Sequence, residues 1–440
     1  MTSLEIGMTG FAALLILLAF RIPIAISMLT VGLVGYYMIA GATPLLSYLK
    51  TETYWRFTTD SLSVIPLFVL MGQFAAKAGL SKALFSAANT WLGHHRGGVA
   101  MAAVGGCAGF GAITGSSLAT AATMGQVALP ELRRFNYAGS LATGALAAGG
   151  TLGILIPPSV VLIIYAVLVE ANVATLFLAA FIPGLMAAIG YLITIAIVVR
   201  INPEAGPAGE RQPYSARFLA LYEVWPVLLI FLLVMGGIYG GFFTPTEGAG
   251  VGATGTFLIA VTKGGMRLDG FVDAVLETAS TTAMIFLILL GAAIFNAFLG
   301  FSQLPQFAAN FFQGSGLTPL TVLFGMVALY ILLGFVMDSL SMILLTAPIF
   351  WPIIAGLDFG MDVESLKIWF GIITLIVVEM GLITPPVGLN VFVINTLAKD
   401  VPMIETFKGV VPFIISDLLR VGLIIAFPII ALLLPALMAN

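Results

Sequence analysis

Long apolar runs separated by short polar segments dominate this chain. The runs are continuous and do not alternate, which favours transmembrane helices over the strands of a membrane barrel. The predicted spans cover residues 7–20, 24–41, 61–77, 139–169, 174–200, 219–240, 244–262, 273–299, 368–397 and 409–436. The pattern therefore predicts an all-α polytopic membrane protein.

Two further apolar stretches each contain a polar tip near the middle. The first, about 100–132, contains Gly115-Ser116-Ser117, and the second, about 321–356, contains Met337-Asp338-Ser339. We interpret both as re-entrant hairpins, which enter and leave the membrane on the same side. A plain pair of full spans is the alternative for either stretch.

The runs 139–169 and 368–397 are interrupted by related sequences, Gly153-Ile-Leu-Ile-Pro157-Pro158-Ser159 and Gly381-Leu-Ile-Thr384-Pro385-Pro386-Val387. Two successive prolines remove backbone donors and break a helix. Unwound backbone at membrane depth is tolerated only where it faces protein or a polar cavity. Two breaks in corresponding positions indicate the substrate and ion site of a secondary transporter.

The basic residues predict which loops are cytoplasmic. Arg200, Arg211 and Arg217 bracket the segment 202–213, which is therefore cytoplasmic by the positive-inside rule. The uncharged loop 300–320 and the acidic loop 357–366 then fall outside. One segment, 50–60, is placed outside against the rule. Its charged residues are Lys50, Glu52, Arg56 and Asp60.

The repeated pattern extends beyond the proline pairs. Ser116-Ser117-Leu118 matches Asp338-Ser339-Leu340 at one constant offset. An odd number of predicted full spans separates the two halves, which makes the repeats inverted. The predicted organisation is N-terminal scaffold helices 1–60, a first inverted repeat 61–200, a cytoplasmic connector 201–218, scaffold helices 219–272 and a second inverted repeat 273–440.

The composition agrees with a membrane protein and excludes several other classes. Of the 440 residues 60% are hydrophobic and 8% charged, against about 25% charged in soluble domains. The net charge of −3 gives no basic surface for nucleic acid. The single cysteine, Cys107, excludes an internal disulfide. The two histidines, His94 and His95, lie beside Arg96 without the acidic or thiol partners of a metal or hydrolytic site.

The hairpin tips and the helix breaks supply oxygen ligands for a hard monovalent cation such as Na⁺. Freed carbonyls at each break would act together with hydroxyls from Ser116, Ser117, Thr120, Ser339 and Thr384. The amides at the start of each second half-helix favour a carboxylate. Ser159 and Asn390 follow the two breaks closely enough to contribute to substrate binding. A single serine or threonine in a membrane helix is commonly a packing residue. These residues are interpreted as ligands because they lie beside the Pro–Pro breaks in both halves.

Acidic residues within apolar runs are functional candidates because they are costly in a membrane. Asp338 lies at a hairpin tip and could help to coordinate a cation. Glu379 precedes Gly381, and Glu247 follows Thr244-Pro245-Thr246. For Glu379 and Glu247 a structural hydrogen bond to freed backbone and an ion-linked role are both open.

Together these motifs resemble the large membrane (M) subunit of TRAP transporters, the tripartite ATP-independent periplasmic family, and are DctM-like. The resemblance covers nearly the whole chain. It lies in the segments around Ser116-Ser117, Thr151 to Ser159, Pro183-Gly184, Thr244 to Glu247, Met337 to Leu340 and Val378 to Val391.

The resemblance implies a Na⁺-driven importer of an organic acid with an elevator mechanism, similar to the ion transporter superfamily. It implies two partners, a periplasmic substrate-binding protein and a small four-helix membrane subunit, in a bacterial inner membrane. Ser116, Ser117, Gly153, Pro157 and Pro158 would serve one Na⁺. A second set, Ser339, Thr384, Pro385 and Gly388, would serve another. The substrate would lie between the tips, near Ser116, Ser159, Ser339 and Asn390.

Three rival functions remain open from the sequence. The first is a stand-alone Na⁺-coupled carboxylate transporter that needs no binding protein. A passive channel is the second. An intramembrane enzyme is the third, and no nucleophile–histidine–acid arrangement supports it. The sequence does not identify the organic acid, for which C4-dicarboxylates, sialic acid and related carboxylates are candidates. No cofactor other than the coupling Na⁺ is expected.

Overall fold

A computed structural model describes every residue except 21, 60–61, 315, 336 and 439–440. The side chain of residue 56 is also outside the description. Two positions used in the predictions, Asp60 and the start of the first repeat at residue 61, therefore lie outside the described residues. For Arg56 only the backbone is described. Every regular element that the structure describes is a helix. The predicted all-helical, multi-span class is confirmed.

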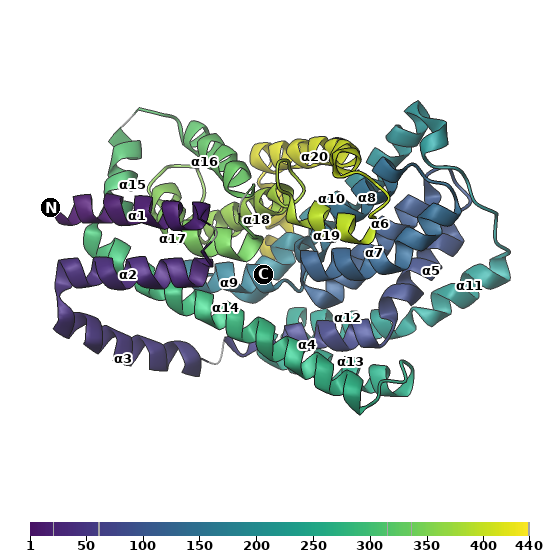
Figure 1. Ribbon diagram of the computed structural model, residues 1–440, viewed down its shortest axis with the longest axis horizontal. Helices are drawn as coiled ribbons and strands as arrows, with labels where there is room; N and C mark the ends of the chain where they lie inside the picture. The colour runs from purple at the N-terminus through teal and green to yellow at the C-terminus, as the bar shows by residue number, and fades with distance from the viewer. Residues whose placement is uncertain (21, 60–61, 315, 336, 439–440) are drawn as a thin grey trace.

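Three N-terminal helices, α1 (Ser3–Ala19), α2 (Ile24–Ala40) and α3 (Ala42–Thr58), lie together at one end of the molecule (Figure 1). They pack on the long helix α14 (Leu268–Ser302), which extends from there toward α4 (Val64–Lys77) and α13 (Pro245–Thr262). α5 (Leu80–Leu92) and α11 (Tyr214–Glu223) lie at the opposite end and contact each other.

The same order of elements occurs twice along the chain. The first series is α4, α5, α6 (Gly98–Thr114), α7 (Ser117–Arg134), α8 (Gly139–Leu155), α9 (Val160–Val169) and α10 (Val173–Ile201). The second series is α14, α15 (Leu304–Gly314), α16 (Pro319–Leu333), α17 (Ser339–Ala355), α18 (Val363–Gly381), α19 (Leu389–Leu397) and α20 (Met403–Ala426). Between them lie a short 3₁₀ turn, Pro203–Ala205, then α11, α12 (Trp225–Tyr239) and α13, and the chain ends with α21 (Ile429–Met438).

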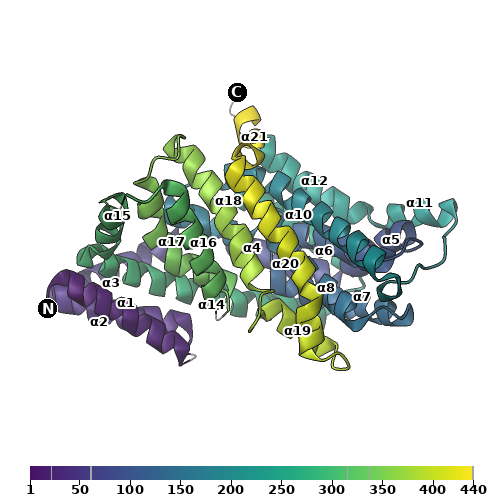
Figure 2. The ribbon, with the colours of Figure 1, turned by 90° about the horizontal axis from the view of Figure 1, so that it is seen from above.

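The two series pack on each other reciprocally. α9 contacts α17 of the second series, and α19 contacts α7 of the first. α20 crosses the molecule beside α10 and α18 (Figure 2). The elements of one half therefore complete the surroundings of the other.

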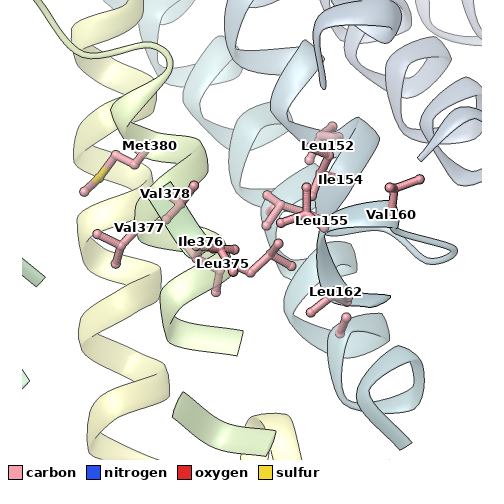
Figure 3. Close-up of a cluster of buried hydrophobic side chains, with 14 of the residues drawn as sticks. Leu152, Ile154, Leu155, Val160, Leu162, Leu375, Ile376, Val377, Val378 and Met380 are labelled. Atoms are coloured by element: carbon pink, nitrogen blue, oxygen red, sulfur yellow. The ribbon is translucent and has the colours of Figure 1, made fainter. Parts of the chain in front are cut away.

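The core lies around α8 and α18, whose residues are buried almost throughout. Figure 3 shows Leu152 and Leu155 of the first broken helix near Leu375 and Ile376 of α18. Both helices are apolar over most of their length, which is the pattern of a helix surrounded by protein. This packing holds the two helix breaks inside the molecule.

Among the residues that the structure describes, three helices, α10, α14 and α20, are long and apolar enough to cross a membrane alone. The number is up to six if each bent pair counts as one span. The bent pairs are α4 with α5 (63°), α8 with α9 (46°) and α11 with α12 (45°). The predicted break in 139–169 is therefore confirmed as a bend between two half-helices.

Two segments predicted as loops are largely helical. The segment 50–60 largely belongs to α3, and much of the uncharged 300–320 loop belongs to α15. A search for spanning runs misses such helices because their polar and apolar residues are mixed. The connector 201–218 is also shorter than predicted, since α11 begins at Tyr214, and the run 409–436 is interrupted near Pro428.

Candidate functional site

The first hairpin, formed by α6 and α7, turns at a glycine followed by two serines. Gly115 has a left-handed backbone (φ 62°) and ends α6, a conformation that favours glycine. Ser116 is the N-cap of α7, and its Oγ accepts a hydrogen bond from the Ala119 amide at 3.4 Å. Serine is favoured at this position because it satisfies a free amide of the first turn. Ser117 follows and is fully buried.

The second hairpin, formed by α16 and α17, places an acidic cap in the corresponding position. Asp338 Oδ2 accepts hydrogen bonds from the Leu340 amide (3.1 Å) and the Ser341 amide (3.2 Å). A carboxylate here also interacts favourably with the positive end of the helix dipole. Ser339 follows as the first residue of α17 and is buried.

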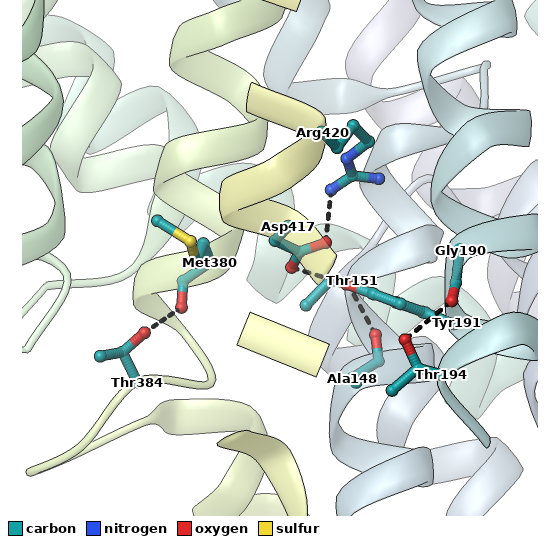
Figure 4. Close-up of polar contacts among 9 residues, drawn as sticks. All are labelled: Ala148, Thr151, Gly190, Tyr191, Thr194, Met380, Thr384, Asp417 and Arg420. Atoms are coloured by element: carbon teal, nitrogen blue, oxygen red, sulfur yellow. Dashed lines mark hydrogen bonds and ion pairs between the residues drawn. The ribbon is translucent and has the colours of Figure 1, made fainter. Parts of the chain in front are cut away.

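The two helix breaks differ in burial. Pro157 and Pro158 are buried, and Ser159 caps α9 by accepting from the Leu162 amide at 3.3 Å. Pro385 is exposed, and the Thr384 hydroxyl donates to the Met380 carbonyl at 2.6 Å (Figure 4). Both Pro–Pro peptide bonds are cis. The first break is thus enclosed by protein, whereas the second reaches the surface.

Each hairpin meets a broken helix through two glycines. A Cβ on Gly111 would lie 2.5 Å from Gly153 Cα, and one on Gly334 would lie 2.6 Å from Gly381 Cα. No side chain fits in such contacts, and small residues permit this approach of helices in a membrane. The hairpin tips are therefore fixed against the breaks in both halves.

Oxygen atoms of the first hairpin tip lie close against Gly153. A Cβ on Gly153 would be 2.4 Å from Thr120 Oγ1 and 2.5 Å from the Ser116 carbonyl oxygen. A Cβ on Gly115 would be 2.8 Å from the Pro158 carbonyl oxygen. Thr120 Oγ1 is also 2.9 Å from Thr114 Oγ1. The structure thus brings the predicted residues Ser116, Thr120 and Gly153 together.

A cavity of about 500 Å³ separates the hairpin tips from two other helices. Ser116, Ser117, Asp338 and Ser339 line one side, and α4 and α14 form the other. The polar side chains on the α4 and α14 side are Gln73, Glu277 and Thr281. This volume is within the range of small-molecule sites.

Ser159 and Asn390 do not line this cavity. Ser159 is fully buried at its cap position, and the Asn390 amide donates to the Ala147 carbonyl at 3.2 Å, which joins α19 to α8. Thr384, Pro385 and Gly388 are likewise absent from its lining.

Glu379 links both hairpin tips. Its Oε1 accepts a hydrogen bond from Ser339 Oγ at 2.6 Å, and its Oε2 accepts one from Ser117 Oγ. The side chain is 1% exposed. Its partners are therefore hydroxyls of two other segments and not the freed backbone that the sequence suggested as the structural alternative.

Glu247 has a local structural role. Its Oε2 accepts from the Thr244 amide at 2.8 Å, and its own amide donates to Thr244 Oγ1 at 3.2 Å. This is a capping box at the start of α13. The structural alternative for Glu247 is the one observed.

A second buried polar cluster joins α20, α10 and α8 (Figure 4). Arg420 donates to Asp417 Oδ1 at 2.9 Å, and the Tyr191 hydroxyl donates to Asp417 Oδ2 at 2.8 Å. Tyr191 is also 3.0 Å from Thr151 Oγ1. Asp417 and Arg420 are charged residues within an apolar run, which is a signal for function, although neither is among the predicted site residues.

Metal coordination by acidic, histidine or cysteine side chains is not a feature of the described part of the chain. No group of three or more such side chains there is placed to hold an ion.

Comparison with known proteins connects this arrangement to a family. Residues 11–430 match the DctM component of the tripartite ATP-independent periplasmic transporter. The chain is 36% identical over 377 residues to the C4-dicarboxylate TRAP transporter large permease protein DctM of Pseudomonas aeruginosa, covering 85% of this chain and 86% of that protein. It is 30% identical over 417 residues to the sialic acid TRAP transporter large permease protein SiaM of Vibrio cholerae, covering 94% and 95%.

A solved structure shares the fold. The YdaH transporter of Alcanivorax borkumensis superposes with a TM-score of 0.63 at 14% sequence identity, covering 95% of this chain and 99% of that one. The family match extends over nearly the whole sequence, including both hairpins and both breaks. The chain belongs to the DctM family of TRAP transporter large permease components, and it is a secondary transporter and not an enzyme.

Proposed function

We propose that this protein is the large transmembrane subunit of a Na⁺-coupled, binding-protein-dependent TRAP transporter that imports an organic acid. The main support is the cavity between the two hairpin tips and α4 and α14, together with the oxygens of one tip that lie close against Gly153. The C4-dicarboxylate and sialic acid relatives make a carboxylate the first substrate class to test.

We assign the first Na⁺ to the surroundings of the first break. The oxygens near Gly153 fit a hard cation, because Ser116 supplies a carbonyl and Thr120 a hydroxyl to the same small space. The set is completed by Ser117, Pro157 and Pro158. A bound Na⁺ would offset the charge of the substrate carboxylate beside it.

We assign the second Na⁺ to Asp338, Ser339, Thr384, Pro385 and Gly388. Asp338 and Ser339 line the cavity, and the Thr384 oxygen keeps lone pairs free because its proton goes to the Met380 carbonyl. For the substrate, Ser116 would donate to its carboxylate, and Ser339, whose proton goes to Glu379, would accept from an O–H or N–H of the organic acid. Ser159 and Asn390 would act from behind the cavity wall, through α9 and α19.

We propose that the two series of helices are inverted repeats that work as an elevator. The hairpins and broken helices would move as one body against a scaffold that includes α2, α12 and α13. Reciprocal packing of α9 on α17 and of α19 on α7 supports this division, because it ties both halves into one unit. In this proposal the chain divides into scaffold, first repeat, connector, scaffold and second repeat. Their boundaries are the predicted ones, 1–60, 61–200, 201–218, 219–272 and 273–440.

The inverted topology predicts which side of the membrane each loop faces. A cysteine at Ala208, which is exposed in the connector, should react with an impermeant maleimide only from the cytoplasmic side. A cysteine at Val363, exposed at the start of α18, should react only from outside. The native Cys107 is buried and gives little background. Reaction of both positions from the same side would contradict the topology.

We further propose two partners and a location. A periplasmic protein would deliver the organic acid, and a small four-helix membrane subunit would support the large one, as the name of the tripartite family suggests. The assembly would lie in a bacterial inner membrane.

Reconstitution in liposomes tests the function directly. Uptake of a labelled organic acid should require an inward Na⁺ gradient, the binding protein and the small subunit. Uptake by the large subunit alone would support a stand-alone carboxylate transporter. A flux that is linear in substrate concentration and indifferent to Na⁺ would support a channel. The organic acid is best found by a thermal-shift ligand screen of the binding protein.

A further inference from the structure

One fully buried carboxylate is shared by the tips of both hairpins. Glu379, in the last turns of α18, accepts one hydrogen bond from Ser117 and one from Ser339. These two serines are the first residues of α7 and α17, and both line the cavity. Glu379 itself does not line the cavity and lies one layer behind it.

An ionised Glu379 fixes the direction of two hydroxyl protons. A serine hydroxyl has one proton to donate and two lone pairs, whereas an ionised carboxylate can only accept. Because Ser117 and Ser339 each donate to Glu379, they can only accept from whatever occupies the cavity. Their oxygens are therefore suited to a cation or to an N–H or O–H donor, and not to a carboxylate.

Ser116 has the opposite polarity. Its Oγ accepts from the Ala119 amide, so its proton remains available to a ligand in the cavity. The cavity thus contains one serine that can donate to a carboxylate, beside two serines that cannot.

We propose that Glu379 is a positioning residue that orients the Ser117 and Ser339 hydroxyls as cation acceptors and so sets the Na⁺ affinity of both hairpin tips together. This inference rests on the Na⁺ coupling proposed above. The cost of burying a carboxylate in a membrane protein is considerable, and two hydrogen bonds from opposite tips offset it only while both tips are in place. Movement of either tip alone would leave one carboxylate oxygen without a donor.

The variant Glu379→Gln tests whether Glu379 orients the two serine hydroxyls or only holds the two hairpin tips together. The amide has nearly the same shape and can keep both contacts, but its NH₂ donates, so one serine must accept and turn its own proton to the cavity. The Na⁺ concentration for half-maximal uptake should rise about tenfold, the effect expected when one hydrogen bond to a charged group is reversed. The same rise should appear in the Na⁺ concentration that stabilises the purified protein against heating, which does not depend on transport.

Glu247→Gln is the matched control. It makes the same chemical change in a capping box, where glutamine can replace glutamate, and Na⁺ dependence should stay as in the wild type. If Glu379→Gln also leaves the Na⁺ dependence of uptake and of thermal stability unchanged, the inference is wrong. If the wild type itself shows no Na⁺ dependence, the proposed coupling fails instead.

A double-mutant cycle tests separately whether Glu379 acts through the two serines. Ser117→Ala with Ser339→Ala removes both hydroxyls that Glu379 orients. Adding Glu379→Gln to that pair should then change the Na⁺ requirement of the folded fraction by less than twofold, because coupled residues are not additive. A further tenfold rise would show that Glu379 acts independently of the serines and would overturn the inference.

Discussion

Replacing Gly153 by alanine is expected to reduce Na⁺-driven uptake at least about a hundredfold while the protein still folds and inserts. The new Cβ would lie 2.4 Å from Thr120 Oγ1 and 2.5 Å from the Ser116 carbonyl oxygen. The Thr120 side chain is buried and the Ser116 oxygen belongs to the backbone of the tip, so neither can move without displacing the hairpin. Such misplacement of binding groups by about 1 Å is enough for a large loss of function.

Gly105→Ala is the matched control for this prediction. Gly105 lies on α6 of the same hairpin, and the nearest atom to an added Cβ is the Ala88 side chain at 3.8 Å. That is an ordinary contact distance, and alanine is also favoured over glycine within a helix. Uptake and Na⁺-dependent thermal stability should match the wild type. Normal uptake by Gly153→Ala would show that the oxygens beside Gly153 do not belong to the Na⁺ site.

The two breaks and the hairpin tips could be predicted because their causes are local. Pro157 and Pro385 interrupt helices through missing amide donors and ring clashes. Ser116 and Asp338 are favoured helix caps whatever surrounds them. The structure accordingly begins α7 and α17 directly after these residues.

The partners of Glu379 could not be predicted, because they come from two other segments of the chain. Ser117 and Glu379 are 262 positions apart in the sequence, and only the packing of α7, α17 and α18 brings them together. The same limit applies to Asn390, whose amide reaches Ala147 across the two halves. α3, α5 and α15 were missed for another reason, since helices of mixed polarity give no signal in a search for apolar spans.

Asp417 and Arg420 show that a charged pair within an apolar run should be selected even without a Pro–Pro break beside it. Their spacing of three residues places both on one face of α20, and Tyr191 of α10 completes the cluster. The cluster reaches Thr151, close in sequence to Gly153. It therefore joins the first broken helix to α10 and α20.

Arg420→Met is expected to destabilise the folded protein by about 3–5 kcal/mol, the usual cost of removing one partner of a buried ion pair. Asp417 would lose its ion pair with Arg420 at a site where its side chain is 2% exposed. The yield of monodisperse protein in detergent and its melting temperature should both fall markedly. The double variant Asp417→Asn with Arg420→Met should recover most of this loss, because it removes both charges and keeps an acceptor for Tyr191.

Lys408→Met provides the comparison on the same helix. Lys408 pairs with Glu405 at the same three-residue spacing and a distance of 3.0 Å, but the side chains are 66% and 41% exposed. An exposed pair contributes at most about 1 kcal/mol, so this variant should melt close to the wild type. Equal melting temperatures for Arg420→Met and Lys408→Met would mean that the buried cluster does not stabilise the fold. Burial, and not the ion pair itself, is thus the property on which the difference between the two variants depends.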